Sequence, residues 1–311
     1  MRALYVVNPH ATTTTAHIRD VIAGELKANL DLELVETRHQ GHARDLARQA
    51  TEEGIDLLIA LGGDGTINEI VNGVLETPGP HPAVTVVPGG SGNVFARGLG
   101  LPRDPVQATR AILERIEAGA EPRWVNLGWV DDGSTGRYFT FNAGFGWDAR
   151  VLQEVEHQRT AGHKASAQRY AANALRLFLT DPSVRRPTFH VELPDGLSIS
   201  DVYLTLVTNM SPWTFAGPLA IQPTPDCRLD GGLDAFVLTR IDPVSVGRAL
   251  AKMLTPGGAP PHGRGYSILH DVQSFTIRAS EPSAWHVDGD YLGHQDHLGF
   301  VSVAKALQVI A

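Results

Sequence analysis

The sequence lacks disulfide-forming cysteines, long apolar runs and an excess of positive charge. Its single cysteine, Cys227, cannot form an internal disulfide, which fits a reducing compartment, and a small buried side chain is its simplest interpretation. No apolar run reaches transmembrane length. The formal net charge of −8 argues against bulk binding to nucleic acid or to a strongly anionic membrane, although a local basic patch remains compatible with it.

The apolar part of the amino-terminal segment Met1–Pro9 is too short for a signal peptide and is typical of a first strand. We therefore expect a cytoplasmic protein whose membrane contact, if any, is peripheral. A length of 311 residues predicts one large or two moderate domains.

Residues 57–69, LLIALGGDGTINE, combine a strand-length apolar run with three glycines, an aspartate and the start of a helical pattern. An entirely apolar strand belongs in the middle of a parallel sheet that helices cover. Glycines at its carboxyl end allow a sharp turn and the close approach of a ligand to bare amides. Because ligands of open α/β sheets bind at that end of the strands, the stretch predicts a phosphate-handling loop.

Strand and helix patterns alternate up to Pro122, which predicts βαβ units and a parallel sheet. The expected strands are 3–7, 32–36, 57–61 and 83–87.

Beyond Pro122 short strands and turn residues dominate, apart from one helical region over 147–179 that we expect to break near Gly162. The pattern predicts a mostly antiparallel β-sandwich domain. Its expected strands are 124–130, 138–142, 188–193, 202–209, 233–238, 275–279 and 284–287. The resulting prediction is an α/β domain over residues 1–123 and a β-sandwich domain over 124–299, with the last run, 300–311, returning to either of them.

A second glycine-rich loop, Pro88–Asn93, follows the next predicted strand. One such loop alone is best explained as a tight turn, but two at one sheet edge favour phosphate binding. Neither loop contains the lysine of a Walker A motif. A lone dinucleotide-type pattern at residues 144–149 lacks the acidic residue expected about 20 positions later, and a turn with close helix packing explains it better.

Five segments in order resemble the motifs of the diacylglycerol kinase catalytic-domain family, which includes soluble bacterial diacylglycerol kinases, related bacterial lipid kinases and sphingosine kinases. They are Asn8–Pro9, Gly62–Glu69, Pro88–Asn93, Leu229–Asp234 and Val287–Asp290. The resemblance implies an NAD-kinase/phosphofructokinase-like α/β domain, a second strand-rich domain and transfer of a phosphoryl group from ATP to a lipid hydroxyl. It also implies roles for particular residues. Those it places at the nucleotide are Asn8, Pro9, His10, Ala11, Thr12, Thr37, Gly63, Asp64, Gly65, Thr66, Ile67, Asn68, Glu69 and Ser91.

The resemblance further implies a magnesium site at Cys227–Gly232, with the carboxylate of Asp230 and the backbone carbonyls of Cys227 and Gly232 as ligands. Oxygen ligands suit Mg²⁺. Without the family, a hairpin turn before the following strand explains this segment equally well.

Residues Asp288 and Asp290 carry the acid–base hypothesis. A lipid hydroxyl attacks phosphorus poorly unless a carboxylate accepts its proton. Family members commonly have Asp-Gly-Glu here, with the glutamate as proton acceptor, and this chain has the shorter Asp290. We assign Asp290 as the base and Asp288 as its partner; a plain turn between strands is the alternative.

Alternatives to a diacylglycerol kinase remain open at this stage. They are a sphingosine, long-chain-base or other lipid kinase, an NAD kinase-like phosphotransferase, and a catalytically weak nucleotide- or lipid-binding regulator. The helix over residues 170–179 is either core or a surface at a lipid cleft or membrane interface. An exposed sheet edge in the second domain could support a homodimer.

Overall fold

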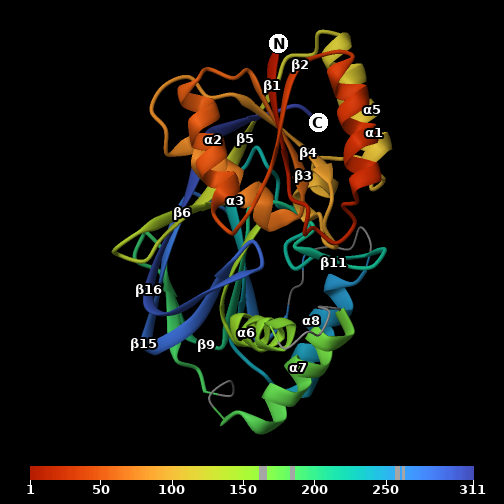
Figure 1. Ribbon diagram of the computed structural model, residues 1–311. Helices are drawn as coiled ribbons and strands as arrows, with labels where there is room; N and C mark the ends of the chain where they lie inside the picture. The colour runs from red at the N-terminus through yellow and green to blue at the C-terminus, as the bar shows by residue number, and fades with distance from the viewer. Residues whose placement is uncertain (161–166, 183–185, 256–259, 261–262) are drawn as a thin grey trace. The chain divides into compact units, whose positions relative to one another are not determined.

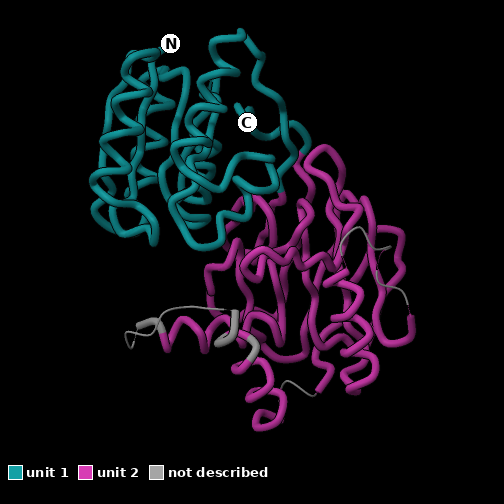
Figure 2. Tube along the Cα trace, turned by 90° about the vertical axis from the view of Figure 1, so that its right-hand side faces the viewer, with its two compact units in different colours: residues 1–127, 304–311 teal, residues 128–303 magenta. Residues whose placement is uncertain are grey.

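The computed structural model describes residues 1–160, 167–182, 186–255, 260 and 263–311, which form two compact units (Figures 1 and 2). Unit 1 comprises Met1–Leu127 and Ala304–Ala311, and unit 2 comprises Gly128–Val303. The predicted domain boundaries, after residues 123 and 299, lie four residues before the observed ones, after Leu127 and Val303. The last run returns to unit 1, where Val309 pairs in parallel with Val84.

Unit 1 contains a parallel sheet with the strand order β4-β3-β1-β2. Every residue of β3 and β4 is buried, as the apolar runs predict. The strands are β1 (Arg2–Val7), β2 (Asp31–Glu36), β3 (Leu57–Gly62) and β4 (Ala83–Pro88). The helices are α1 (Ala16–Lys27), α2 (His42–Glu52), α3 (Asp64–Leu75), α4 (Val94–Gly98) and α5 (Pro105–Glu117).

Side-chain caps fix where two of these helices begin. The hydroxyl of Thr15 accepts a hydrogen bond from the Ile18 amide at 3.2 Å at the start of α1. Asp104 caps α5 in the same way through the Gln107 amide, at 2.9 Å, and Pro105 occupies the first turn. The alternation of strand and helix in unit 1 is thus encoded locally.

Unit 2 is rich in strands, and the pairings wholly within it are antiparallel. The inward side chains of its strands share one apolar core, which includes Phe145, Phe275 and Phe300. Its shorter strands are β6 (Gly136–Phe139), β7 (Asn142–Gly146), β8 (Phe189–Glu192), β9 (Ser198–Val202), β10 (Leu204–Thr208), β11 (Thr214–Ala216), β12 (Leu219–Ile221), β13 (Leu233–Leu238) and β14 (Tyr266–Val272). The longer strands are β5 (Arg123–Asp131), β15 (Ser274–Val287) and β16 (Asp290–Val309), of which β5 and β16 extend into both units. The predicted fold class, a parallel α/β part followed by a strand-rich antiparallel part, is confirmed.

Three strand predictions for unit 2 were wrong in detail. The expected strand 138–142 is two strands, because the amides between β6 and β7 turn toward the carboxylate of Asp288. The expected strand 202–209 begins only at Leu204, just after Asp201 at φ 58°. The two strands expected within 275–287 are one long strand, β15.

The predicted helical region contains α6 (Trp147–Thr160) and α7 (Ala167–Thr180), and Gly162 lies outside the described residues. The sequence analysis missed α8 (Pro243–Met253), although Asp242 caps it and Pro243 starts it, which are ordinary helix-start signals. None of the helices in the described ranges is both long and apolar enough to cross a bilayer.

Gly73 marks the tightest approach of α3 to α2. A Cβ atom at Gly73 would lie 2.2 Å from the carbonyl oxygen of Arg44 and 3.0 Å from the Cβ of Ala47. Gly24 in α1 has open space around its Cα. The two helical glycines can therefore be compared directly, because a Cβ has room at Gly24 and has none at Gly73.

We expect Gly73→Ala to lower the free energy of unfolding by about 1–3 kcal/mol, because the backbones of α2 and α3 must separate. We expect Gly24→Ala to raise it by about 0.5–1 kcal/mol, because alanine restricts the unfolded chain and favours helix. Urea denaturation followed by circular dichroism measures both, and equal stabilisation by the two variants would contradict the packing described.

Candidate functional site

The two glycine-rich loops lie against each other in unit 1. They follow β3 and β4, which are neighbouring parallel strands with Gly62 in register with Pro88. The Gly89 amide donates to the Gly62 carbonyl at 2.9 Å. A Cβ at Gly90 would lie 2.6 Å from the Cα of Gly63. Glycine is therefore required here because backbone meets backbone, and the prediction that both loops share one sheet edge is confirmed.

The chain after β1 joins the same edge. The Asn8 amide donates to the Leu61 carbonyl at 2.9 Å, and its side-chain amide donates to the Thr66 hydroxyl at 3.0 Å. The Asn8 side-chain oxygen accepts from the His10 amide at 3.0 Å, which turns the chain. Asn8 thus links the loop after β1 to the first turn of α3.

Thr14 carries an unsatisfied group beside these loops. Its hydroxyl is buried and has no hydrogen-bond partner among the described residues. A Cβ at Gly89 would lie 2.7 Å from that oxygen. Buried polar atoms are normally paired, so this hydroxyl is a candidate contact for a bound polar group.

The loop after β3 leads directly into the amino terminus of α3, where the backbone amides of the first turn have no partner within the helix. Gly63 occupies the N-cap position and provides no side-chain hydrogen bond. Uncapped first-turn amides and the helix dipole together favour an anion. The polyphosphate of a nucleotide fits such a position, and the exposed Ser91 adds a hydroxyl on the neighbouring loop.

Asp64, the first residue of α3, points toward α4. One of its carboxylate oxygens accepts from the Phe95 amide at 3.3 Å, and a Cβ at Gly92 would lie 2.9 Å from the other. Arg97, which the sequence analysis missed, interacts electrostatically with Asp64. Burial lowers the pKa of the Arg97 guanidinium, the positive charge of Arg103 lowers it further, and Asp64 raises it. Arg97 follows the second loop by one helical turn, a spacing that could have identified it.

Several other residues that were predicted to contact the nucleotide instead make contacts that stabilise the fold of unit 1. Both carboxylate oxygens of Glu69 accept amide hydrogen bonds from the start of α2, from Gly41 at 2.8 Å and Ala43 at 3.2 Å. The Thr37 amide donates to the Val7 carbonyl at 2.8 Å, which extends the β1–β2 pairing. Ile67 and Asn68 are fully buried. The remaining predicted residues lie in the loops or first helical turn: Pro9, Ala11, Thr12 and Gly65.

Asp288 and Asp290 lie in unit 2 in contrasting environments. Asp288 is 4% exposed and accepts four hydrogen bonds at 2.8–3.1 Å, from the amides of residues 140, 141 and 142 and from the Thr140 hydroxyl. The Asp290 side chain is 37% exposed, and Arg137 donates to it at 3.1 Å. Of the two carboxylates, only that of Asp290 is open to a substrate.

A buried polar array lies behind these residues. His286 and Asp148 are 2.6 Å apart between Nε2 and Oδ2, and the Tyr170 hydroxyl donates to the other oxygen of Asp148. A Cβ at Gly144 would lie 2.2 Å from His286 Nε2. Gly144 is therefore a close-packing glycine, as the sequence analysis preferred, although it lies in the middle of β7 and not in a turn.

The predicted magnesium segment has other partners in unit 2. Both carboxylate oxygens of Asp230 accept from the Arg228 guanidinium at 2.9 Å. The Gly232 amide donates to Asp271 at 2.5 Å. Burial raises the pKa of the Cys227 thiol to about 12, so sulfur is unsuited to be a ligand.

This segment lines a pocket of about 300 Å³, whose wall contains four aspartates together with Arg228 and His270. Its buried Asp234 accepts from the Asp271 amide at 2.8 Å and pairs with His270 at 2.9 Å. Burial raises the pKa of the Asp234 carboxyl, and the hydrogen bond to Asp234 raises the pKa of His270. Across the described residues no three His, Cys, Asp or Glu side chains converge to hold a metal. Both carboxylate oxygens of Asp230 are paired with Arg228, so this arrangement of ligands does not fit Mg²⁺. The magnesium site therefore stays a prediction.

Comparison with known proteins identifies similar chains. Residues 2–121 match the sequence model of the diacylglycerol kinase catalytic domain. The chain is 27% identical over 293 residues to a diacylglycerol kinase of Staphylococcus carnosus, covering 93% of this chain and 88% of that protein. It is 28% identical over 299 residues to the diacylglycerol kinase of Bacillus subtilis, covering 94% and 90%.

A more similar match is shorter. Over 139 residues the chain is 38% identical to a Chromohalobacter salexigens protein named "Probable lipid kinase YegS-like", and this covers 44% of the chain and 42% of that protein. The crystal structure of a diacylglycerol kinase from Bacillus anthracis shares the fold, with a TM-score of 0.74, 20% identity and coverage of 99% of this chain and 96% of that one.

These matches agree with the ordered motifs and with the paired glycine loops at the edge of the parallel sheet. Similarity to a kinase family implies the use of ATP. Residues 2–121 match the diacylglycerol kinase catalytic-domain family, and over most of its length the chain is similar to bacterial diacylglycerol kinases.

Proposed function

We propose that this protein transfers the γ-phosphoryl group of ATP to the hydroxyl of diacylglycerol, which yields phosphatidic acid. The observation that carries the proposal is the contact between the two glycine loops beside the uncapped first turn of α3. The names of the relatives in Staphylococcus carnosus and Bacillus subtilis support the choice of acceptor.

Unit 1 supplies the phosphate-binding part of this proposal. Bound ATP supplies the transferable phosphoryl group. The first-turn amides of α3 stabilise negative charge on the phosphates, and the hydroxyls of Thr14 and Ser91 donate hydrogen bonds to them. Asn8 holds Thr66 in place at 3.0 Å, so the loop is organised before the nucleotide binds.

Unit 2 supplies the base. Asp290 accepts the proton of the lipid hydroxyl as the oxygen attacks phosphorus. Arg137, at 3.1 Å, orients the Asp290 carboxylate. Asp288 holds the backbone before β7 and is a positioning residue, because its four hydrogen bonds engage both of its oxygens.

The proposal predicts phosphorylation of diacylglycerol in a panel of acceptors that also contains a long-chain base, a glycolipid and NAD. Radiolabelled ATP reports transfer, and mass spectrometry identifies the product. If the main product is a phosphorylated long-chain base or NADP, the acceptor is that long-chain base or NAD, and the proposal of diacylglycerol is wrong. Binding of ATP without transfer to any acceptor would favour a regulator.

Asp290→Asn is expected to lower turnover about 10²–10⁴-fold, because the amide cannot accept the proton. Nucleotide affinity, measured by calorimetry, is expected to stay within about twofold because Asp290 is assigned to the acceptor. Asp296→Asn is the matched control, since Asp296 is an exposed aspartate of the same strand, β16, and should keep full activity. Wild-type turnover in Asp290→Asn would remove Asp290 as the base.

Asp288→Asn is expected to lower the free energy of unfolding by about 2–4 kcal/mol. The new amide group presents two hydrogens to donors that now bind a carboxylate, which leaves buried amides unpaired. Asp290→Asn should change stability by less than about 1 kcal/mol, since Asp290 is partly exposed. Urea unfolding of both variants tests the division of roles, and equal stability losses would contradict it.

A further inference from the structure

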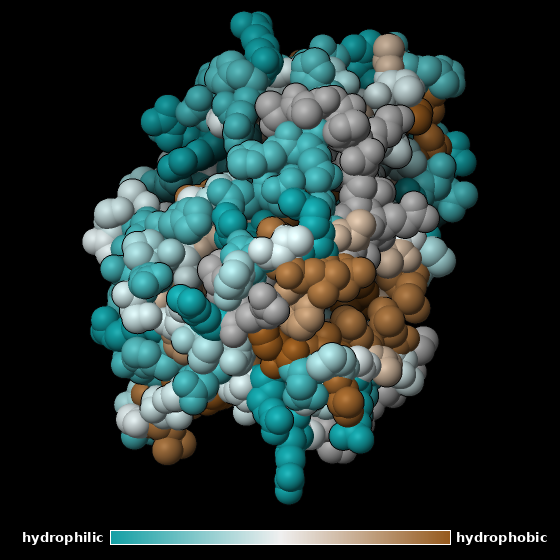
Figure 3. Space-filling model, turned by 90° about the horizontal axis from the view of Figure 1, so that it is seen from below, coloured by the Kyte–Doolittle hydropathy of each residue, from teal (hydrophilic) through white to brown (hydrophobic). Residues whose placement is uncertain are grey.

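A hydrophobic patch occupies part of the face shown in Figure 3. Large apolar side chains are exposed on two helices of unit 2, which gather with α6 at one end of that unit (Figure 1). Leu175 and Leu179 of α7 are 60% and 62% exposed, and Val244 and Leu250 of α8 are 60% and 50% exposed. Apolar exposure concentrated in this way marks a surface that meets something other than water.

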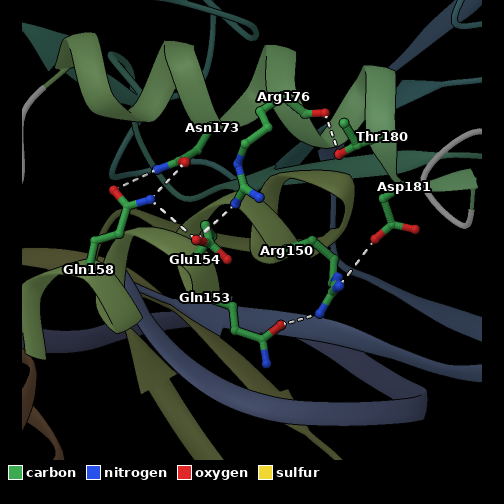
Figure 4. A network of polar contacts seen from close by, with 8 residues as sticks. All are labelled: Arg150, Gln153, Glu154, Gln158, Asn173, Arg176, Thr180 and Asp181. Atoms are coloured by element: carbon green, nitrogen blue, oxygen red, sulfur yellow. Dashed lines mark hydrogen bonds and ion pairs between the residues drawn. The ribbon is translucent and has the colours of Figure 1, made fainter. Parts of the chain in front are cut away.

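Two polar side chains of α7 contact α6 (Figure 4). Asn173, 5% exposed, exchanges two hydrogen bonds with Gln158 at 2.9 and 3.1 Å. Arg176 pairs with Glu154 at 2.8 Å. The helix thus directs Asn173 and Arg176 toward its neighbour, while Leu175 and Leu179 remain exposed.

The inner side of α7 is packed as well. Phe178 contacts the ring of Trp147, with 5.6 Å between ring centroids, and Leu177 is buried. Leu175 and Leu179 are four residues apart and therefore share the opposite side of the helix. They are exposed because the helix is held in this rotation, and a turn about its axis would break the contacts to α6.

α8 repeats the arrangement. Ala249 and Met253 pack into an apolar cluster that also contains Tyr266. Val244 and Leu250 are exposed, and the exposed cation Arg248 lies between them in sequence. Both helices are thus anchored through buried side chains and also expose large apolar side chains.

The charges near this surface favour an anionic partner. Neither α7 nor α8 contains an aspartate or glutamate, although the chain has 34 of them and a formal charge of −8. α8 carries Arg248 and Lys252. Negative charge elsewhere on the chain would repel an anionic bilayer, so these helices are the part suited to face one.

We propose that α7 and α8 form a docking surface for an anionic lipid bilayer, made by Leu175, Leu179, Val244, Leu250 and Arg248. The leucines and valine enter the boundary between head groups and acyl chains, and Arg248 contacts lipid phosphates. The inference rests on the proposed function, because a diacylglycerol acceptor resides in a bilayer. It adds the surface by which the enzyme reaches that acceptor.

The test is co-sedimentation with vesicles of phosphatidylcholine alone or mixed with phosphatidylglycerol, without nucleotide. The double variant Leu175→Glu, Leu179→Glu is expected to partition at least about tenfold less onto the mixed vesicles. Arg248→Glu should weaken binding about tenfold on mixed vesicles at low salt and leave binding to phosphatidylcholine unchanged. Val244→Glu, Leu250→Glu provides a second apolar test on a different helix.

Leu197→Glu is the matched control. Leu197 is 64% exposed, as the α7 leucines are, but it lies in the β8–β9 hairpin, where Asp195 accepts from its amide. This variant should bind vesicles as the wild type does. Thermal unfolding midpoints of all variants check that the fold is kept.

Three results would overturn the proposal. They are unchanged vesicle binding by both double variants, an equal loss in Leu197→Glu, and a wild-type dimer that binds no vesicles and becomes monomeric in Leu175→Glu, Leu179→Glu. The last would assign the surface to a second copy of this chain.

Activity on two forms of the acceptor separates docking from catalysis. The Leu175→Glu, Leu179→Glu variant should phosphorylate water-soluble dioctanoylglycerol at the wild-type rate and lose activity only on long-chain diacylglycerol in vesicles. If the wild type phosphorylates neither lipid while vesicle binding follows the expected pattern, the proposed function fails and the docking surface stands.

Discussion

The close approach of two backbone turns organises the edge of the parallel sheet at which we propose that phosphates bind. β3 and β4 are adjacent parallel strands, and the loops that follow them touch through Gly63 and Gly90, where a Cβ at Gly90 would overlap the backbone of Gly63. This contact sets where α3 begins and leaves its first amides without a side-chain cap. The segment after β1 then attaches through Asn8. An anion site made of backbone depends on sheet register and on glycine more than on any charged side chain.

The acidic residues of the motifs divide into those that hold the fold and those open to chemistry. Asp288 gives both carboxylate oxygens to the turn before β7, and Glu69 gives both of its oxygens to the start of α2. Asp290 is partly exposed beside a single guanidinium. A carboxylate that accepts three or four hydrogen bonds is a poor proton acceptor, because protonation would break them. Burial and the number of hydrogen bonds therefore distinguish Asp288 from Asp290, whose roles the sequence motif alone does not separate.

Charge is unevenly spread over the chain in a way that suits an enzyme acting on a lipid. The net charge is negative, yet α7 and α8 contain no acidic residue and expose four large apolar side chains. α7 exposes Leu175 and Leu179 while Asn173 and Arg176 hold it against α6. The same hydrogen bonds that hold the helix thus create the apolar surface.

Local patterns of the sequence determined much of this protein. The apolar runs of β3 and β4 and the glycine loops predicted the parallel unit and placed both loops at one edge of its sheet, since each signal acts within a few residues. The tertiary structure alone decided that Asp288 is buried, that Arg228 occupies Asp230, and that one side of α7 is both leucine-rich and exposed. Partners such as Thr140 for Asp288 lie far apart in the sequence, and only folding brings such groups within hydrogen-bonding distance.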